Sequence, residues 1–367
     1  MTRSILWMSL QDERPHREYH WLSHMPDTNV TVAGGPPPSP ADGWIPRDYR
    51  SLTRRFTEAV SLSWMTNTAT LPASFDWVAS LELCSLVSAQ SARVARRIGA
   101  KHVVTIWAND PELMFYRLPP YSLATRATRH ADLYLNFIRA GYDHCLALGL
   151  PEERCFYVLP GVDTQAFTPA ITRPHRPTLM YASGLVPKKG IELILRAFVD
   201  EVLPSRPETL LRFMGAGPES SLVQQAALRY PNNIELLPPG GQAEVAARLR
   251  EATVFVTAPV AQRRWNEQYG LAYLEAMASG LPIVTTITGT NHEAVRPPNI
   301  RTRHDACDVG QALLYLVDNP EEASKIGAHN RSLAVAEFDL ATQCRRMGEV
   351  FDTVEARANA SEVTRRR

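Results

Sequence analysis

Lysine is scarce in this chain of 367 residues, which carries most of its positive charge on arginine. Lysine occurs only at positions 101, 188, 189 and 325. Such a bias is typical of GC-rich bacterial genomes, so we expect a bacterial source. A compact ammonium group suits phosphate binding. The pair Lys188-Lys189, directly before Gly190, therefore indicates a phosphate contact, and the alternative is an ordinary helix start.

Other features that the sequence lacks exclude several classes of protein. No apolar run reaches the roughly 18–20 residues that cross a membrane, and the apolar part of residues 1–13 is too short for a signal peptide. Five cysteines, odd in number and without metal-ligand spacing, predict free thiols in a reducing cytoplasm and no metal site. A net charge of +1 gives no reason to expect nucleic acid as a partner.

Short apolar strands alternate with helical patterns, which is typical of parallel α/β sheets. In the first half the predicted strands are Ile5–Ser9, Val30–Ala33, Trp77–Ser80, Val103–Trp107, Leu133–Phe137 and Phe156–Leu159. In the second half they are Leu179–Ala182, Leu210–Met214, Ile234–Leu237, Val254–Thr257 and Ile283–Thr286. The predicted helices include Ser85–Ile98, Ala140–Leu148, Glu192–Val202, Ser220–Tyr230, Gln242–Glu251, Gly270–Ser279, Val309–Asp318 and Leu340–Ala358.

The length predicts two domains, and a polar stretch with prolines, Thr168–Pro177, predicts the hinge between them. We expect Rossmann-like domains over residues 1–168 and 178–338, followed by a helix and a frayed tail over 339–367. Two such domains that face each other would place a cleft at the carboxyl ends of both sheets.

The stretch Trp265–Val284 is the most informative part of the sequence. A helix that starts near Gly270 would point unpaired backbone N–H groups outward, and such a helix end binds phosphate. Glu267 lies just before this helix and Glu275 lies inside it, so two carboxylates could hold vicinal hydroxyls on either side of a diphosphate. The alternative is an amphipathic helix with an acidic first turn, which the helix dipole favours anyway.

This stretch resembles the donor-site motif of retaining glycosyltransferases with the GT-B fold, in particular glycosyltransferase family 4. Three more segments are similar to this family in the same order: Leu159–Pro169 to an interdomain segment, Tyr181–Glu192 to a phosphate-contacting loop, and Phe213–Glu219 to a Gly-x-Gly-Pro turn. The resemblance covers about residues 155–300 closely and implies the GT-B architecture of two facing Rossmann-like domains. It also implies that the last helix, about Leu340–Ala358, crosses back onto the first domain.

The resemblance also implies the roles of individual residues. Lys189 and Glu267 would be catalytic, because a fixed cation stabilises the negative charge on a departing diphosphate and Glu267 would hold the hydroxyls of the sugar. Glu275 would hold the ribose, and the N–H groups of Leu271 and Ala272 the phosphates. No metal and no cofactor would be needed beyond the nucleoside diphosphate sugar. The implied donor site contains Ser183, Gly184, Lys189, Gly215, Glu267, Tyr269, Gly270, Leu271, Ala272 and Glu275. For Tyr273, packing in the core is the favoured interpretation.

The sequence departs from the family pattern in two places. Gly184 occupies a position where the family often has an arginine. Arg263 or Arg264 are candidate replacements, and the favoured alternative is that both are ordinary exposed loop arginines. Trp107 follows a predicted strand where the family commonly has a histidine near the reacting centre. A step that depends on histidine is therefore not predicted.

Acceptor contacts are predicted only from position. Glu82, Asn109 and Asp110 follow predicted strands at the cleft, and His20 lies in a histidine-containing segment for which an exposed helix face is the alternative. The basic segment 47–56 has interleaved aromatic residues, which would suit peripheral contact with anionic lipid or the binding of an anionic acceptor. A solvated helix face is the more common cause of such a run.

These features predict a cytoplasmic, metal-independent glycosyltransferase. It would move a hexose or N-acetylhexosamine from a nucleoside diphosphate sugar, with UDP favoured, to the hydroxyl of a small metabolite or a cell-envelope intermediate. One alternative is a nucleotide-sugar epimerase or hydrolase on the same fold. Another is a non-catalytic partner protein that binds a nucleotide sugar.

Overall fold

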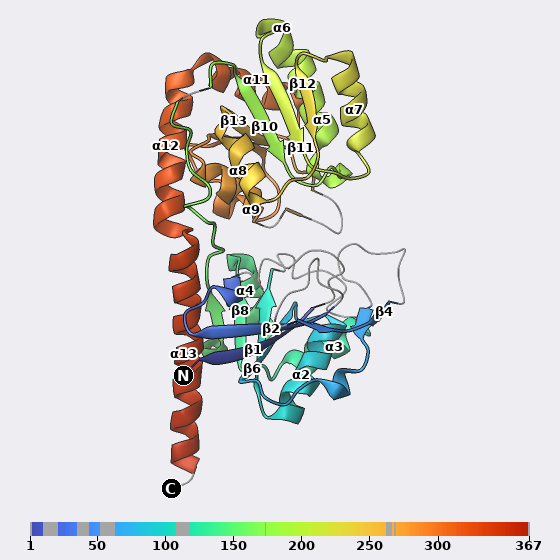
Figure 1. The fold of residues 1–367 in the computed structure, drawn as a ribbon, viewed down its shortest axis with the longest axis vertical. Coiled ribbons are helices and arrows are strands. Elements are labelled where there is room, and N and C mark those ends of the chain that lie inside the picture. The colour runs from blue at the N-terminus through green and yellow to red at the C-terminus, as the bar shows by residue number, and fades with distance from the viewer. Residues whose placement is uncertain are drawn as a thin grey trace. The chain divides into compact units, whose positions relative to one another are not determined.

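The computed structural model describes residues 2–9, 21–34, 44–51, 63–107, 118–172, 174–261, 266–267 and 269–365. The chain divides into two compact units. The first unit comprises Met1–Gly161 together with Ala341–Arg367, and the second comprises Val162–Leu340. Each unit is built around its own β-sheet (Figure 1).

The first unit contains, within the described residues, a seven-stranded sheet in the order β3-β2-β1-β6-β7-β8-β9. Every neighbouring pair in this sheet is parallel. The strands are β1 (Arg3–Met8), β2 (Thr28–Gly34), β3 (Trp44–Pro46), β6 (Trp77–Leu81), β7 (Lys101–Ile106), β8 (Leu133–Asn136) and β9 (Cys155–Tyr157). A separate antiparallel pair consists of β4 (Tyr49–Ser51) and β5 (Ser63–Met65).

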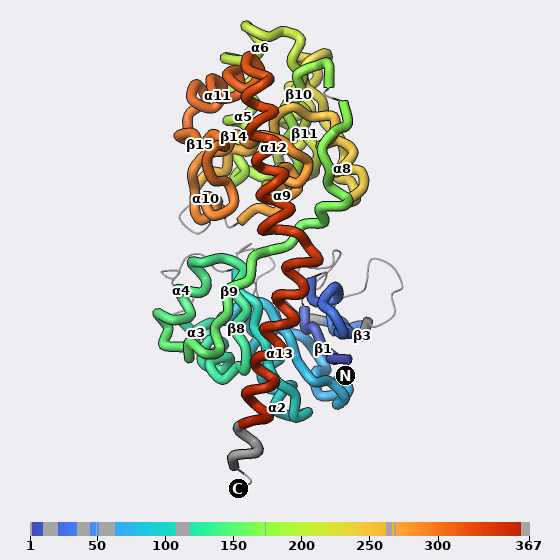
Figure 2. The backbone as a smooth tube through the Cα atoms, turned by 90° about the vertical axis from the view of Figure 1, so that its left-hand side faces the viewer, coloured from blue at the N-terminus to red at the C-terminus, as the bar shows by residue number. Residues whose placement is uncertain are grey.

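Among the described residues, the first unit contains the helices α2 (Leu86–Ile98), α3 (Tyr121–Thr128), α4 (Arg139–Ala147) and most of α13 (Leu340–Arg365). It also contains 3₁₀ turns at η1 (Thr68–Thr70) and η3 (Glu152–Arg154). Helix α13 runs alongside the strands of this unit (Figure 2). Its Phe351 ring lies 4.7 Å from the ring of Trp77, and Glu355 accepts hydrogen bonds from Arg3 and Trp77. The last helix of the chain is therefore part of the core of the first unit.

The second unit contains, in its described part, a six-stranded sheet in the order β12-β11-β10-β13-β14-β15, again with parallel neighbours. Its strands are β10 (Thr178–Ala182), β11 (Leu210–Met214), β12 (Ile234–Leu237), β13 (Val254–Thr257), β14 (Ile283–Thr286) and β15 (Ile300–Thr302). Its helices are α5 (Ile191–Ala197), the π-helical η5 (Phe198–Val202), α6 (Leu203–Ser205), α7 (Ser220–Arg229), α8 (Gln242–Arg250), α9 (Leu271–Ala278), α10 (Asn291–Ala294), α11 (Ala306–Asp318) and α12 (Pro320–Glu337), with a 3₁₀ turn at η4 (Pro187–Lys189).

The predicted architecture of two parallel α/β sheets is confirmed. Strands β10, β13 and β14 are almost entirely buried, as expected for short apolar runs in sheets that are covered on both faces. The core of the second unit includes Leu179, Phe213 and Val256, all fully buried. None of the helices in the described ranges is long and apolar enough to span a membrane.

Candidate functional site

The predicted donor residues lie in the second unit, around the carboxyl ends of β10, β11 and β13. Strand β10 lies between β11 and β13 in the sheet, so the chain leaves β10 to one side first and returns to the other side later. Ligands of open α/β sheets bind outside the carboxyl ends of the strands at such a switch point. The loops that follow β10 and β13 meet at this position.

The loop after β10 is fixed against the end of β13 by close backbone contact. Gly190 has a φ of +70°, and a Cβ atom there would lie 1.9 Å from the carbonyl oxygen of Ala258. The N–H group of Val260 donates to the carbonyl oxygen of Lys188 at 2.9 Å. Only glycine fits this approach, and the contact sets the position of Lys189, the last residue of η4.

The turn after β11 interlocks with the same loop. A Cβ atom at Gly215, which has a φ of +153°, would lie 2.0 Å from the carbonyl oxygen of Ser183. The N–H group of Leu185 donates to the carbonyl oxygen of Ala216 at 3.0 Å. The hydroxyl of Tyr181 donates to the carbonyl oxygen of Gly184 at 2.8 Å. The backbone around Ser183 and Gly184 is therefore held in one conformation.

Lys189 and Glu267, the two predicted catalytic residues, form an ion pair. Lys189 Nζ lies 2.5 Å from Glu267 Oε2, and the side chains are 20% and 7% exposed. These residues are 78 positions apart in the sequence. The fold thus places a cation and a carboxylate together in a mostly buried environment, where electrostatic interactions are stronger than in water.

Helix α9 begins beside this ion pair. Gly270 is its N-cap residue with a φ of +66°, and a Cβ atom there would lie 3.6 Å from Glu267 Oε1. The helix starts at Leu271 and continues through Ala272, and N–H groups in the first turn of a helix lack intrahelical acceptors. Glu275 lies in the following turn and is partly exposed. A carboxylate, a cation and a helix N-terminus therefore meet at one point of the sheet edge.

Two tyrosines near this helix contribute to packing. The Tyr273 hydroxyl lies 2.9 Å from the hydroxyls of both Thr257 and Thr285, and burial raises its pKa to about 12. The side chain of Tyr269 is fully buried, with its ring 6.0 Å from that of Phe338. Core packing of Tyr273 agrees with the expectation from the sequence, and the donor contact of Tyr269 stays a prediction.

One element of the site was not predicted from the sequence: the loop after β14. Gly289 has a φ of +55°, and a Cβ atom there would lie 2.0 Å from the carbonyl oxygen of Glu267. The N–H group of Thr290 donates to the same oxygen at 3.0 Å, and the Asn291 amide donates to the carbonyl of Thr286 at 2.8 Å. This loop holds the backbone of Glu267. Its signal in the sequence is the Thr-Gly-Thr-Asn segment that begins at Thr288, two positions after the end of a buried strand.

Of the predicted acceptor residues, the structure describes only Glu82, in the first unit. It directly follows β6, and its Oε1 accepts a hydrogen bond from the backbone N–H of Trp107 at 2.9 Å. His20, Asn109 and Asp110 lie outside the described residues, as do Arg263, Arg264 and much of the segment 47–56. Their roles stay predictions.

Curated relatives align with much of this chain. It is 28% identical over 277 residues to the GDP-mannose-dependent alpha-(1-6)-phosphatidylinositol monomannoside mannosyltransferase of Mycolicibacterium smegmatis. This alignment covers 70% of the chain and 72% of that relative. It is 26% identical over 210 residues to the GDP-mannose-dependent monoacylated alpha-(1-6)-phosphatidylinositol monomannoside mannosyltransferase of Corynebacterium glutamicum. That alignment covers 53% of the chain and 55% of the relative, so the chain matches little more than half of this relative's length.

The fold is similar to that of HepE from Anabaena, solved in complex with UDP. The TM-score is 0.73 at 14% identity, over 95% of this chain and all of HepE. Residues 165–333, which contain the Lys189–Glu267 pair and α9, match the family described as glycosyl transferases group 1. The chain therefore has the GT-B fold, and the matched part of its second unit is similar to the glycosyl transferases group 1.

Proposed function

We propose that this protein transfers a hexosyl group from a nucleoside diphosphate sugar to an acceptor hydroxyl, with retention of configuration at the anomeric carbon. The observation that carries this proposal is the meeting of Lys189, Glu267 and the N-terminus of α9 at the switch point of the second sheet. This set combines positive charge for a diphosphate with a carboxylate for sugar hydroxyls.

In the proposed reaction, the bond between the anomeric carbon and the phosphate oxygen breaks, and the acceptor oxygen bonds to that carbon on the same face. The acceptor proton passes to the departing phosphate oxygen. Lys189 and the N–H groups of Leu271 and Ala272 would stabilise the negative charge that develops on the diphosphate. Glu267 would hold hydroxyls of the sugar and Glu275 those of the ribose. Since these groups supply the positive charge, the proposal needs no metal ion.

The donor is proposed to carry a hexose or an N-acetylhexosamine. The sequence favours UDP as the nucleoside diphosphate, and UDP is also bound in the solved HepE structure. Two curated relatives are named as GDP-mannose-dependent, which supports GDP-mannose as the second donor to test. The acceptor hydroxyl would belong to a small metabolite or a cell-envelope intermediate, and the names of these relatives support a lipid-linked inositol glycan.

The test is a two-stage assay with purified protein. A thermal-shift screen against UDP-, GDP-, ADP- and TDP-sugars identifies the donor, and mass spectrometry then measures transfer to a panel of hydroxyl acceptors. Donor cleavage or isomerisation without any acceptor would favour the epimerase or hydrolase alternative. Donor binding without turnover across the panel would favour the non-catalytic alternative. Either result would contradict the proposed transfer.

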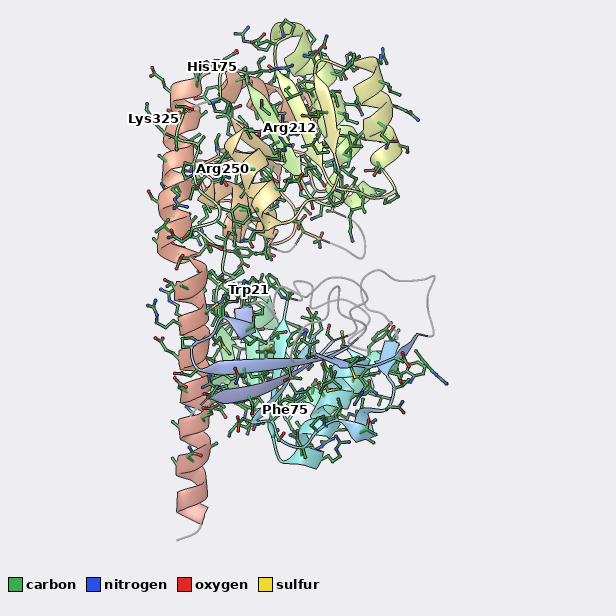
Figure 3. All side chains as sticks on the ribbon, viewed as in Figure 1. Trp21, Phe75, His175, Arg212, Arg250 and Lys325 are labelled. Carbon is green, nitrogen blue, oxygen red and sulfur yellow. The ribbon has the colours of Figure 1, made fainter. Side chains whose placement is uncertain are left out.

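We predict that Lys189→Ala and Glu267→Ala each lower kcat by about 10²–10³-fold, as does loss of one preorganised group at other sites of developing charge. Lys325→Ala is the matched control, because Lys325 lies on α12 of the same unit with its side chain 74% exposed (Figure 3). Removal of one member of a buried pair also destabilises a protein, so each variant is first checked for cooperative unfolding. Unchanged turnover in both folded variants would disprove the site assignment.

A further inference from the structure

The sheet of the first unit has a switch point of its own. Strand β1 lies between β2 and β6, so the carboxyl edge at β1 and β6 is the position where an open α/β sheet binds ligands. Three residues directly follow the strands at this edge: Ser9 after β1, Glu82 after β6 and Trp107 after β7.

These three residues are neighbours in space. Trp7 pairs with Ala79 in the parallel register of β1 and β6, which brings Ser9 beside the end of β6, at the roughly 4.8 Å spacing of adjacent strands. The N–H group of Glu82 donates to the carbonyl oxygen of Thr105 at 2.9 Å. The backbone N–H of Trp107 in turn donates to Glu82 Oε1 at 2.9 Å.

This edge combines three irregular features. Within the described part of the chain, the hydroxyl of Ser9 and the indole N–H of Trp107 are buried without a hydrogen-bond partner. Buried polar groups in proteins are nearly always paired, and exceptions need an explanation. Glu82 adopts a left-handed backbone conformation with a φ of +65°, which is uncommon for a residue with a side chain and clusters at functional sites.

The aromatic packing fixes the position of the indole. The Trp107 ring is stacked on Phe137 with centroids 5.0 Å apart and is tilted against Trp21 at 5.7 Å. Trp21, labelled in Figure 3, is itself anchored by a hydrogen bond from its indole N–H to the carbonyl oxygen of Gly161 at 3.1 Å. A fixed indole presents its N–H group in one direction, as a preorganised binding site requires.

The chemistry of this set selects uncharged hydroxyl groups. A ligand hydroxyl can accept from the indole N–H of Trp107 or the hydroxyl of Ser9 and can donate to the carboxylate of Glu82. A phosphate group could only accept, and the negative charge of Glu82 would repel it. The first cation after the next strand of the sheet, β8, is Arg139, whose Nε lies 3.0 Å from Asp143 Oδ1.

We infer that Ser9, Glu82 and Trp107 form an acceptor subsite that binds the hydroxyls of a neutral ring polyol, either a sugar or a cyclitol. This inference rests on the proposed transferase function and adds the chemical class of the acceptor. Bound hydroxyls would supply partners for the two buried polar groups and would offset the cost of the left-handed conformation of Glu82.

The test measures transfer kinetics with methyl α-D-mannopyranoside and with myo-inositol, which separate a sugar from a cyclitol. We expect each of the variants Ser9→Ala, Glu82→Gln and Trp107→Phe to raise the acceptor KM about tenfold or more, which corresponds to the loss of roughly one good hydrogen bond. The donor KM of each variant should stay within about twofold of the wild-type value. Glu82→Gln retains an oxygen for the Trp107 N–H group, so the local fold is kept. Trp77→Phe is the control, because Trp77 is buried at the amino end of β6, whereas Glu82 follows the carboxyl end of the same strand.

Binding of the two probes is measured separately by saturation-transfer NMR, without any donor. Binding that is lost in Glu82→Gln but retained in Trp77→Phe would support the subsite even if no transfer occurred, so failure of the proposed function is distinguishable. Normal transfer with an unchanged acceptor KM in all three folded variants would overturn the subsite and leave the proposed function intact. Absence of both binding and transfer for both probes would also overturn it.

Discussion

At the scale of the residue, several ionisable side chains are buried, and burial makes their charged forms unfavourable. Each is stabilised by its local environment. Lys189 and Glu267 pair at 2.5 Å. His102 stays neutral: its Nε2 lies 3.0 Å from the hydroxyl of Ser91 and 3.2 Å from that of Ser80. Burial, together with the positive charge of Arg96, lowers the pKa of His102 from 6.5 to about 3. The first unit therefore contains a group whose protonation opposes folding.

We predict that His102 makes the stability of the first unit depend on pH. Between pH 6.5 and about 3 the unfolded chain binds a proton that the folded chain excludes. Its contribution to stability is therefore fully present above pH 6.5 and is lost as the pH falls, with a slope of up to about 1.4 kcal/mol per pH unit. Urea unfolding of wild type and His102→Gln at pH 7, 6 and 5 measures this slope. An equal slope in both proteins would show that other groups cause it.

At the scale of the element, the geometry of loops matters as much as that of the strands they connect. The loop from η4 to Gly190 is held in backbone contact with Ala258, and helix α13 completes the core of the first unit through Phe351. One of these elements positions the candidate site and the other stabilises a unit, so their variants should give different phenotypes.

We predict that Gly190→Ala disrupts the position of Lys189. The added methyl group would lie 1.9 Å from the Ala258 carbonyl oxygen, at a φ of +70° that alanine rarely adopts. We expect a loss of stability of about 2–3 kcal/mol or more and loss of donor binding. Gly241→Ala is the matched control in the same unit, because its Cβ would meet no atom within 4 Å. Equal donor affinity in the Gly190 variant and wild type would contradict this role of the loop.

We predict that Phe351→Ala destabilises the first unit by about 3–5 kcal/mol, the usual cost of removing a buried aromatic ring. Phe351 is fully buried, and Arg3 lies over its ring at 5.1 Å from the centroid. Arg345→Ala, at an exposed position on the same helix, should change stability by less than about 0.5 kcal/mol. Chemical denaturation followed by circular dichroism measures both variants. A small effect of Phe351→Ala would mean that α13 adds little to this core.

The elements that could be predicted from the sequence are those with a local signal. Leu210–Met214 and Val254–Thr257 are strands with the predicted bounds because each is a short, mostly apolar segment. The antiparallel strand Ser63–Met65 is too short to show a period of two. The support of Glu267 by Gly289 and Thr290 depends on contacts between separate loops. The sequence predicts a role for Lys189 and for Glu267 but not their ion pair, because the two residues are 78 positions apart.

At the scale of the whole molecule, the two units have separate cores and an uneven distribution of tryptophan. Six of the seven tryptophans lie between residues 7 and 107, and the other is Trp265. Tryptophan fluorescence therefore reports mainly on the first unit, whereas the candidate donor residues belong to the second. This separation allows the unfolding of the two units to be followed with different probes.

We predict that the nucleoside diphosphate of the donor stabilises the second unit selectively. A ligand at a hundredfold excess over its Kd adds about 2.7 kcal/mol to the state that binds it. Hydrogen exchange of residues 178–340 should slow on addition of UDP or GDP, while the thermal transition seen by tryptophan fluorescence should move little. An equal shift of both signals would show that the two units unfold as one cooperative block.

The division of the first unit between two stretches of chain has a consequence for biosynthesis. Residues 162–340 form the second unit as one continuous stretch, but the first unit needs residues 341–367 in addition to residues 1–161. During translation, part of the apolar surface of the first unit therefore stays uncovered until α13 leaves the ribosome. The order in which the two units can be completed during translation is therefore the reverse of the order in which they begin.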